Sequence, residues 1–169
     1  MATIETITYS ANTAITFDIS GLGTSGTFVA GRECSQIDNT SNMYVDAIVN
    51  VGGITSGATV AIGQMIQLYL WGADTSLATT AIDVLDGTDS AETLGHVSVL
   101  NSLILVAAPA VTVATASLKY YIMPFSVAAK FGGVMPKFWG LYLAHNHGSS
   151  LAASQSALFQ YTGIKYTET

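Results

Sequence analysis

The sequence predicts an all-β protein, an antiparallel β-sandwich of the jelly-roll type that forms a single domain over residues 1–169. Three observations lead to this expectation. Apolar and polar residues alternate with a period of two in several segments, as in strands that bury one face. Turn signals containing glycine or asparagine separate these segments at short intervals. No long segment combines a 3.6-residue period with helix-capping residues, so we expect about eight to ten short strands in two packed sheets.

The first strands are expected where apolar side chains recur at every second position. In an extended segment, this spacing places the side chains on one face. The three clearest sets are Ile15, Phe17 and Ile19, then Val45, Ala47, Val49 and Val51, and then Ile66, Leu68 and Leu70.

The later strands are expected to be richer in aromatic residues. Leu103–Ala107 is apolar throughout, as a strand buried on both faces would be. Leu118–Phe125 and Phe138–His145 are aromatic-rich strand candidates, and Leu158–Tyr166 is the closing strand. The residues expected on one face of that closing strand are Phe159, Tyr161 and Gly163.

Two segments between the strands lack a strand pattern. Asp74–Thr93 is the longer of them, and its acidic residues indicate a solvated loop and a candidate contact loop. Ser149–Ala157 is rich in alanine, so one helical turn is expected there.

The composition excludes several classes of protein. Hydrophobic residues make up 50% of the chain, whereas charged residues make up only 9%, against about 25% in an average soluble protein. Intrinsic disorder needs the opposite balance. A formal net charge of −6 argues against binding to nucleic acid. The longest apolar stretch, 103–116, is interrupted by Pro109 and is shorter than the ~20 residues of a membrane span. The first ten residues lack the pattern of a secretory signal, so we expect synthesis in a cytoplasm and no membrane.

So few charges also predict assembly with other copies of the chain. Apolar surface that is not hidden by charge is usually hidden by protein, so a homo-oligomer is the simplest interpretation. The alternative is a monomer whose surface is coated with its 16 Ser and 20 Thr residues. Cys34 is the one cysteine, so no internal disulfide can form. The positive charge of Arg32 would favour the Cys34 thiolate, and the negative charge of Glu33 would oppose it. The two effects cancel, which favours an inert thiol.

His145-Asn146-His147 is the one arrangement that suggests a metal ion. On a strand, the two imidazoles point the same way and could reach one ion. A cupin would add a nearby Glu and a later His, but the next acid is Glu168 and the only other histidine, His96, lies upstream. Three such pairs on a trimer axis would give six nitrogens, which suits iron. The interpretation we favour is structural: a strand that runs into a glycine turn, with no metal or cofactor.

Other candidate sites have simpler interpretations. Calcium is suggested by Asp83, Asp86, Asp89 and Glu92, but their spacing of three is not that of a calcium-binding loop, so a solvated acidic loop is favoured. Stacking on sugars is suggested by Tyr69, Trp71, Trp139 and Tyr142, for which packing in the core or between subunits is favoured. No nucleophile motif, phosphate loop or dinucleotide fingerprint occurs, so no catalytic or cofactor-binding residue is assigned and no enzyme is expected.

The last third of the chain resembles small β-sandwich structural proteins from the virions of tailed bacteriophages. In those proteins a proline and an aromatic residue lead a strand to an Asn/Gly turn, and a Tyr-Thr strand closes the chain. The segments that carry the resemblance are Phe131–Ala144, Asn146-His147-Gly148, Leu151–Ser154 and Phe159–Gly163, together with Gly63–Gly72 in the middle of the chain. They cover about a third of the sequence. The two histidines in the turn depart from the pattern.

The resemblance implies a virion component without enzymatic activity. The closest role is a capsid decoration (cement) protein on the outer capsid surface, a homotrimer whose partner is the major capsid protein. Contacts repeated over many copies would then supply avidity. Two alternatives stay open: a tail-fibre or receptor-binding domain with lectin-like binding, and a cupin-like metalloenzyme.

Overall fold

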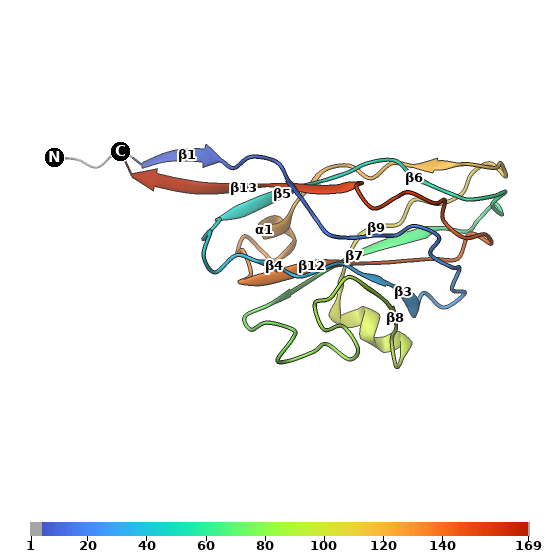
Figure 1. Ribbon diagram of the computed structural model, residues 1–169, viewed down its shortest axis with the longest axis horizontal. Coiled ribbons are helices and arrows are strands. Elements are labelled where there is room, and N and C mark those ends of the chain that lie inside the picture. The colour runs from blue at the N-terminus through green and yellow to red at the C-terminus, as the bar shows by residue number, and fades with distance from the viewer. Residues whose placement is uncertain (1–4, 169) are drawn as a thin grey trace.

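Two antiparallel β-sheets packed face to face form the molecule, as the computed structural model shows for residues 5–168 (Figure 1). The first sheet has the order β1 (Glu5–Tyr9), β13 (Phe159–Glu168), β5 (Asp46–Val51) and β11 (Phe125–Ser126), and β2 (Thr13–Ala14) also pairs with β13. The second has the order β8 (Ser90–Thr93), β3 (Ala30–Glu33), β12 (Phe138–His145), β7 (Ile66–Ala73) and β9 (Ile104–Ala107), and β4 (Ile37–Asp38) also pairs with β12. The sandwich is confirmed, whereas the strand order does not confirm a jelly-roll connection.

Four short elements complete the secondary structure of residues 5–168. β6 (Ile54–Thr55) and β10 (Lys119–Tyr120) form a separate two-stranded pair. The 3-10 helix η1 (Val97–Ser102) and the α-helix α1 (Val127–Lys130) are the only helices among residues 5–168. Neither is long and apolar enough to cross a membrane.

The main core lies between the two sheets and follows the period-two pattern. Ile66, Leu68 and Leu70 of β7 are fully buried there. They face the buried residues of the first sheet, which include Ala47, Val49, Phe159 and Tyr161. The side chains of Ile15, Phe17 and Ile19 are buried in this core, as their alternation predicts. Residues 15–19 form no strand, however, so the strand expected there is wrong.

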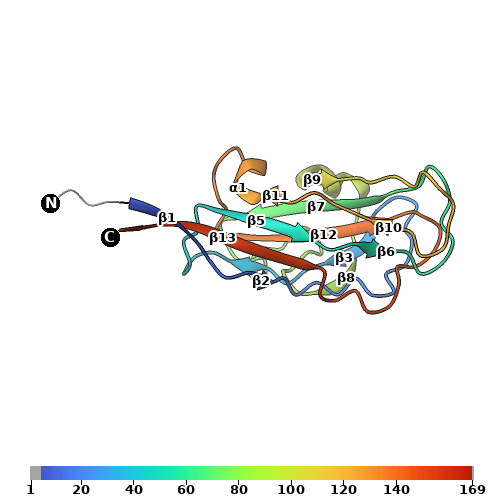
Figure 2. The same cartoon turned by 90° about the horizontal axis from the view of Figure 1, so that it is seen from above.

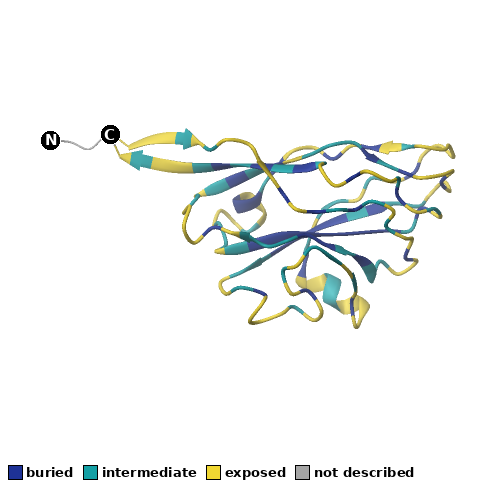
Figure 3. Ribbon diagram, viewed as in Figure 1, coloured by how far each residue is buried: buried dark blue, intermediate teal, exposed yellow. Residues whose placement is uncertain are grey.

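A second core covers the other face of the second sheet (Figure 3). Tyr69 and Trp71 of β7 and Tyr142 of β12 are buried on this face. Their cover comes from Leu77 and Leu85, which are at most 1% exposed. The second sheet is therefore buried on both faces at β7 and β12. Burial on both faces is otherwise typical of parallel sheets covered by helices.

This second core corrects the expectation for Asp74–Thr93. The segment is not a solvated loop: it contains the strand β8, which pairs with β3, and it buries Leu77 and Leu85. Leu77 and Leu85 belong to the same buried cluster as Tyr69, Trp71 and Tyr142, so packing holds the segment in place although most of its residues are polar.

Three further expectations need correction. Leu103–Ala107 is not buried on both faces, because β9 is an edge strand and Leu105 is 47% exposed. Leu118–Phe125 is not one strand: only Lys119–Tyr120 and Phe125–Ser126 pair with neighbours. Ser149–Ala157 contains no helical turn; its residues form turns and one isolated bridge. The strands expected at Phe138–His145 and Leu158–Tyr166 are confirmed as β12 and β13.

Candidate functional site

The two histidines singled out in the sequence lie side by side in the interior. His145 ends β12, and Gly148, with a φ of 88°, turns the chain just after His147. The two imidazole rings stack with centroids 4.1 Å apart, and both residues have no exposed surface. The ring of Tyr120 also stacks on that of His147, with centroids 5.6 Å apart. The i, i+2 spacing thus does place both side chains together, and β10 adds a third ring.

Hydrogen bonding and burial fix the charge of this stack. His145 Nε2 lies 2.9 Å from the carbonyl oxygen of Leu22. Since a carbonyl only accepts, Nε2 carries the proton. Neither ring nitrogen of His147 nor the Tyr120 hydroxyl has a hydrogen-bond partner among the described residues. Burial, followed by repulsion from His145, lowers the pKa of His147 to about 4. Burial also lowers the pKa of His145. Both histidines are therefore neutral at pH 7.

The stack has few of the features of a metal centre. Within residues 5–168, no group of three or more His, Cys, Asp or Glu side chains gathers around a common point. Both imidazoles are enclosed within one copy of the chain, so an ion shared across a trimer axis would require them to leave the core. The favoured interpretation, a strand that runs into a glycine turn, describes their position.

A second polar cluster anchors the segment that covers the second core. Glu33 of β3 is fully buried, and its two carboxylate oxygens accept hydrogen bonds from the backbone N–H groups of Asp86 and Gly87 at 3.0 and 3.1 Å. Burial raises the pKa of Glu33 to about 8, although the two N–H donors oppose the shift. Gly87 has a φ of 82°, which suits a glycine at this turn.

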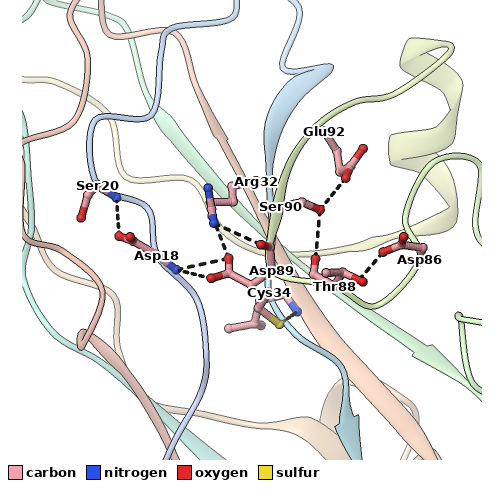
Figure 4. Close-up of polar contacts among 10 residues, drawn as sticks. Asp18, Ser20, Arg32, Cys34, Asp86, Thr88, Asp89, Ser90 and Glu92 are labelled. Carbon is pink, nitrogen blue, oxygen red and sulfur yellow. Dashed lines mark hydrogen bonds and ion pairs between the residues drawn. The ribbon is translucent and has the colours of Figure 1, made fainter.

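Next to it lies the only ion pair among the described residues (Figure 4). Arg32 Nε donates to Asp89 Oδ1 at 2.7 Å, and an Arg32 terminal nitrogen donates to the Asp89 carbonyl at 3.1 Å. The same carboxylate accepts from the backbone N–H of Asp18. These contacts tie β8 to β3 and to the N-terminal loop, so the cluster is a structural anchor.

The four acids considered for calcium do not converge on one point. Asp83 accepts from the backbone N–H of Gly95, and Asp86 from that of Thr88. Asp89 pairs with Arg32, and Glu92 accepts from Ser90. Each carboxylate therefore serves a different local contact.

The other candidates are buried inside the protein. Cys34 is fully buried, its Sγ accepts from the Leu141 backbone N–H at 3.0 Å, and burial raises the pKa of its thiol. The aromatic residues considered for sugar stacking, which are Tyr69, Trp71, Trp139 and Tyr142, are at most 6% exposed. Packing in the core is therefore confirmed for all four.

The exposed apolar surface was not singled out from the sequence. It includes a two-stranded extension, the terminal ribbon, formed by Glu5–Tyr9 and Ile164–Glu168. β5 pairs with β13 only up to Ile164, so beyond that point β13 has only β1 beside it. Both views show the ribbon extending past the end of the sandwich (Figures 1 and 2).

The terminal ribbon has one apolar and one polar face. Residues directly opposite each other in a ladder share a face. Ile7 pairs with Tyr166 and Tyr9 with Ile164, and Ile7, Tyr9 and Tyr166 are 57%, 69% and 56% exposed. The polar face holds Thr6, Thr8, Lys165 and Thr167. The alternation of Ile7 with Tyr9 and of Ile164 with Tyr166 was the available sequence signal.

Comparisons of the chain with protein-family models, with curated proteins and with solved structures gave no match. The class of protein that the fold defines is thus an all-β antiparallel sandwich of two sheets. Its functional assignment depends on its own surface and interior.

Proposed function

We propose that the chain is a non-enzymatic structural protein of a tailed-bacteriophage virion, a capsid decoration protein that binds the outer shell and stabilises it. It assembles as a homo-oligomer, a trimer by the resemblance, and its partner is the major capsid protein. It is made in the host cytoplasm and resides on the capsid surface.

One observation carries this proposal: apolar side chains remain on the surface while the chemically suggestive ones are enclosed. Tyr9, Tyr121 and Met123 are 69%, 73% and 84% exposed. Large exposed apolar residues on a chain with 9% charged residues favour contact with protein. By contrast, His145, Glu33 and Cys34 have no exposed surface, so they offer a solute no access.

The test is binding to undecorated capsids. Purified protein mixed with such capsids should bind at a fixed number of copies per capsid subunit and should raise the temperature at which the capsids open. Bovine serum albumin at the same concentration is the control for adsorption. Absence of saturable binding would contradict the proposal.

A glycan-binding module of a tail fibre is the second candidate, favoured by the exposed tyrosines. Tyr9, Tyr121 and Tyr166 could stack on sugar rings. A glycan array separates the two proposals: selective binding that is lost in Tyr121→Ala supports the module, and an array without signal argues against it.

A further inference from the structure

Three features lead to a specific contact between copies of the chain. The first is the terminal ribbon, whose apolar face is exposed. Its pairing with the rest of the sheet, through β5, ends at Ile164. Within β13 the buried positions are Phe159, Tyr161 and Gly163, whereas Ile164 and Tyr166 lie on the opposite face. The apolar face of the ribbon therefore continues the outer face of the sheet and has no contact with the core of its own copy.

The second feature is the charge at the outer end of the described part of the terminal ribbon, which we call its tip. Glu5 and Glu168 are direct partners in the ladder, and both are exposed. Like charges in directly opposite positions destabilise a strand pair. Lys165 lies on the other face, opposite Thr8. A cation from outside the ribbon would relieve this repulsion.

The third feature is a groove between the free edges of the two sheets, which we call the edge groove. β9 is the edge strand of one sheet and β11 that of the other. The groove has a volume of about 460 Å³ and is lined by residues that include Val106, Pro109, Tyr121, Met123, Phe125 and Lys130. Tyr121, Met123 and Lys130 are exposed, and no carboxylate lines the groove. A second groove, of about 430 Å³, carries Lys137 but also Asp74, which would repel an acidic tip.

We propose that the terminal ribbon of one copy docks in the edge groove of a second copy, with Glu5 and Glu168 beside Lys130 and with Tyr166 against Met123. Aromatic–thioether packing and an ion pair then cover surfaces that each copy alone leaves exposed. Because ribbon and groove are different surfaces, the contact is head-to-tail and closes into a ring when the rotation between copies allows it. The inference deepens the proposed function and rests on its claim that the copies assemble.

Cysteine cross-linking tests the pairing directly. Tyr166→Cys and Met123→Cys are made in separate chains, mixed and oxidised with diamide; Cys34 is buried and stays unreactive. We expect a disulfide-linked dimer in the mixture and none in either variant alone. A dimer of Tyr166→Cys alone would place ribbon against ribbon and overturn the inference, as would the absence of a cross-link in the mixture.

Solution mass provides a second, independent measurement. Ile7→Lys changes the apolar face of the ribbon, and its matched control Thr6→Lys places the same charge on the adjacent position of the polar face. Sedimentation should show assembly at least tenfold weaker for Ile7→Lys than for the wild type. Thr6→Lys should assemble as the wild type does, and the circular dichroism of both variants should be unchanged. Lys130→Glu should weaken assembly similarly, and combination with Glu5→Lys and Glu168→Lys should restore it. Equal weakening of assembly by Ile7→Lys and Thr6→Lys would overturn the inference. So would a failure of Glu5→Lys and Glu168→Lys to restore the assembly lost in Lys130→Glu.

The outcome is distinguishable from failure of the proposed function. If the ribbon–groove cross-link is absent while capsid binding is saturable, this inference fails and the function stands. If the cross-link forms while capsids bind nothing, the function fails and the contact between copies stands.

Discussion

Trp71 lies directly over Gly140. The two residues are partners in the ladder of β7 and β12, and a Cβ atom on Gly140 would lie 2.4 Å from Trp71 Cζ2. Trp71 is 1% exposed, so its ring has no free space into which to retreat. The missing side chain at position 140 thus leaves the space that the indole occupies.

The first prediction concerns this contact. Gly140→Ala should lower the free energy of unfolding by about 1–3 kcal/mol, because the added methyl group forces the indole or the strand to move. Urea unfolding monitored by tryptophan fluorescence measures it. Gly23→Ala is the matched control, since a Cβ atom there meets nothing within 4 Å. Equal stability of the two variants would contradict this account of the contact.

The second prediction is a loss of stability in acid caused by the histidine stack. Folding lowers the pKa of His147 from 6.5 to about 4. The unfolded chain therefore takes up the proton first, and the stability that the neutral ring provides is lost as the pH falls from about 6.5 towards 4. The full shift corresponds to about 3 kcal/mol. Denaturant titrations at several pH values should show a smaller acid loss in His147→Phe.

The third prediction has the opposite sign and concerns Glu33. Folding raises its pKa from 4.5 to about 8, so the folded chain holds the proton more tightly. Its contribution to stability is present below pH 4.5 and is lost as the pH rises through 8, by at most about 5 kcal/mol. Glu33→Gln should therefore flatten the stability profile between pH 5 and 8.5. An unchanged profile in Glu33→Gln would contradict the assignment.

The fourth prediction concerns the Cys34 thiol. Burial raises its pKa and blocks access, so the folded protein should react with a disulfide reagent on the order of 100-fold more slowly than the urea-unfolded chain. The absorbance of the released thiolate measures both rates, and the unfolded chain is the internal control. Rapid labelling without denaturant would show that β3 and β12 separate readily.

The sequence predicted the elements whose pattern is local. Phe138–His145 is rich in aromatic and apolar residues, and it forms β12 as expected although it includes Gly140. The sets led by Ile15 and Ile66 alternate regularly, and their apolar members are buried. In these segments, the period of the side chains alone decides which face points inward.

The remaining features depend on contacts between distant segments. The cover of Trp71 by Leu77 and Leu85 could not be predicted, because two leucines in a polar segment carry no period. For the histidine stack, the i, i+2 rule predicted that the two imidazoles lie together, but Tyr120 comes from a two-residue strand that has no pattern of its own. Strand register, which determines the apolar face of the terminal ribbon, likewise requires the structure.

The position of β13 in the first sheet has a consequence for synthesis on the ribosome. β1, β2 and β5 all hydrogen-bond to β13, although it follows them by more than a hundred residues in the chain. The early strands therefore leave the exit tunnel without their partner and expose unpaired edges until Phe159–Glu168 has been translated. Rapid translation of the intervening residues, or a chaperone that shields the nascent chain, would shorten this vulnerable interval.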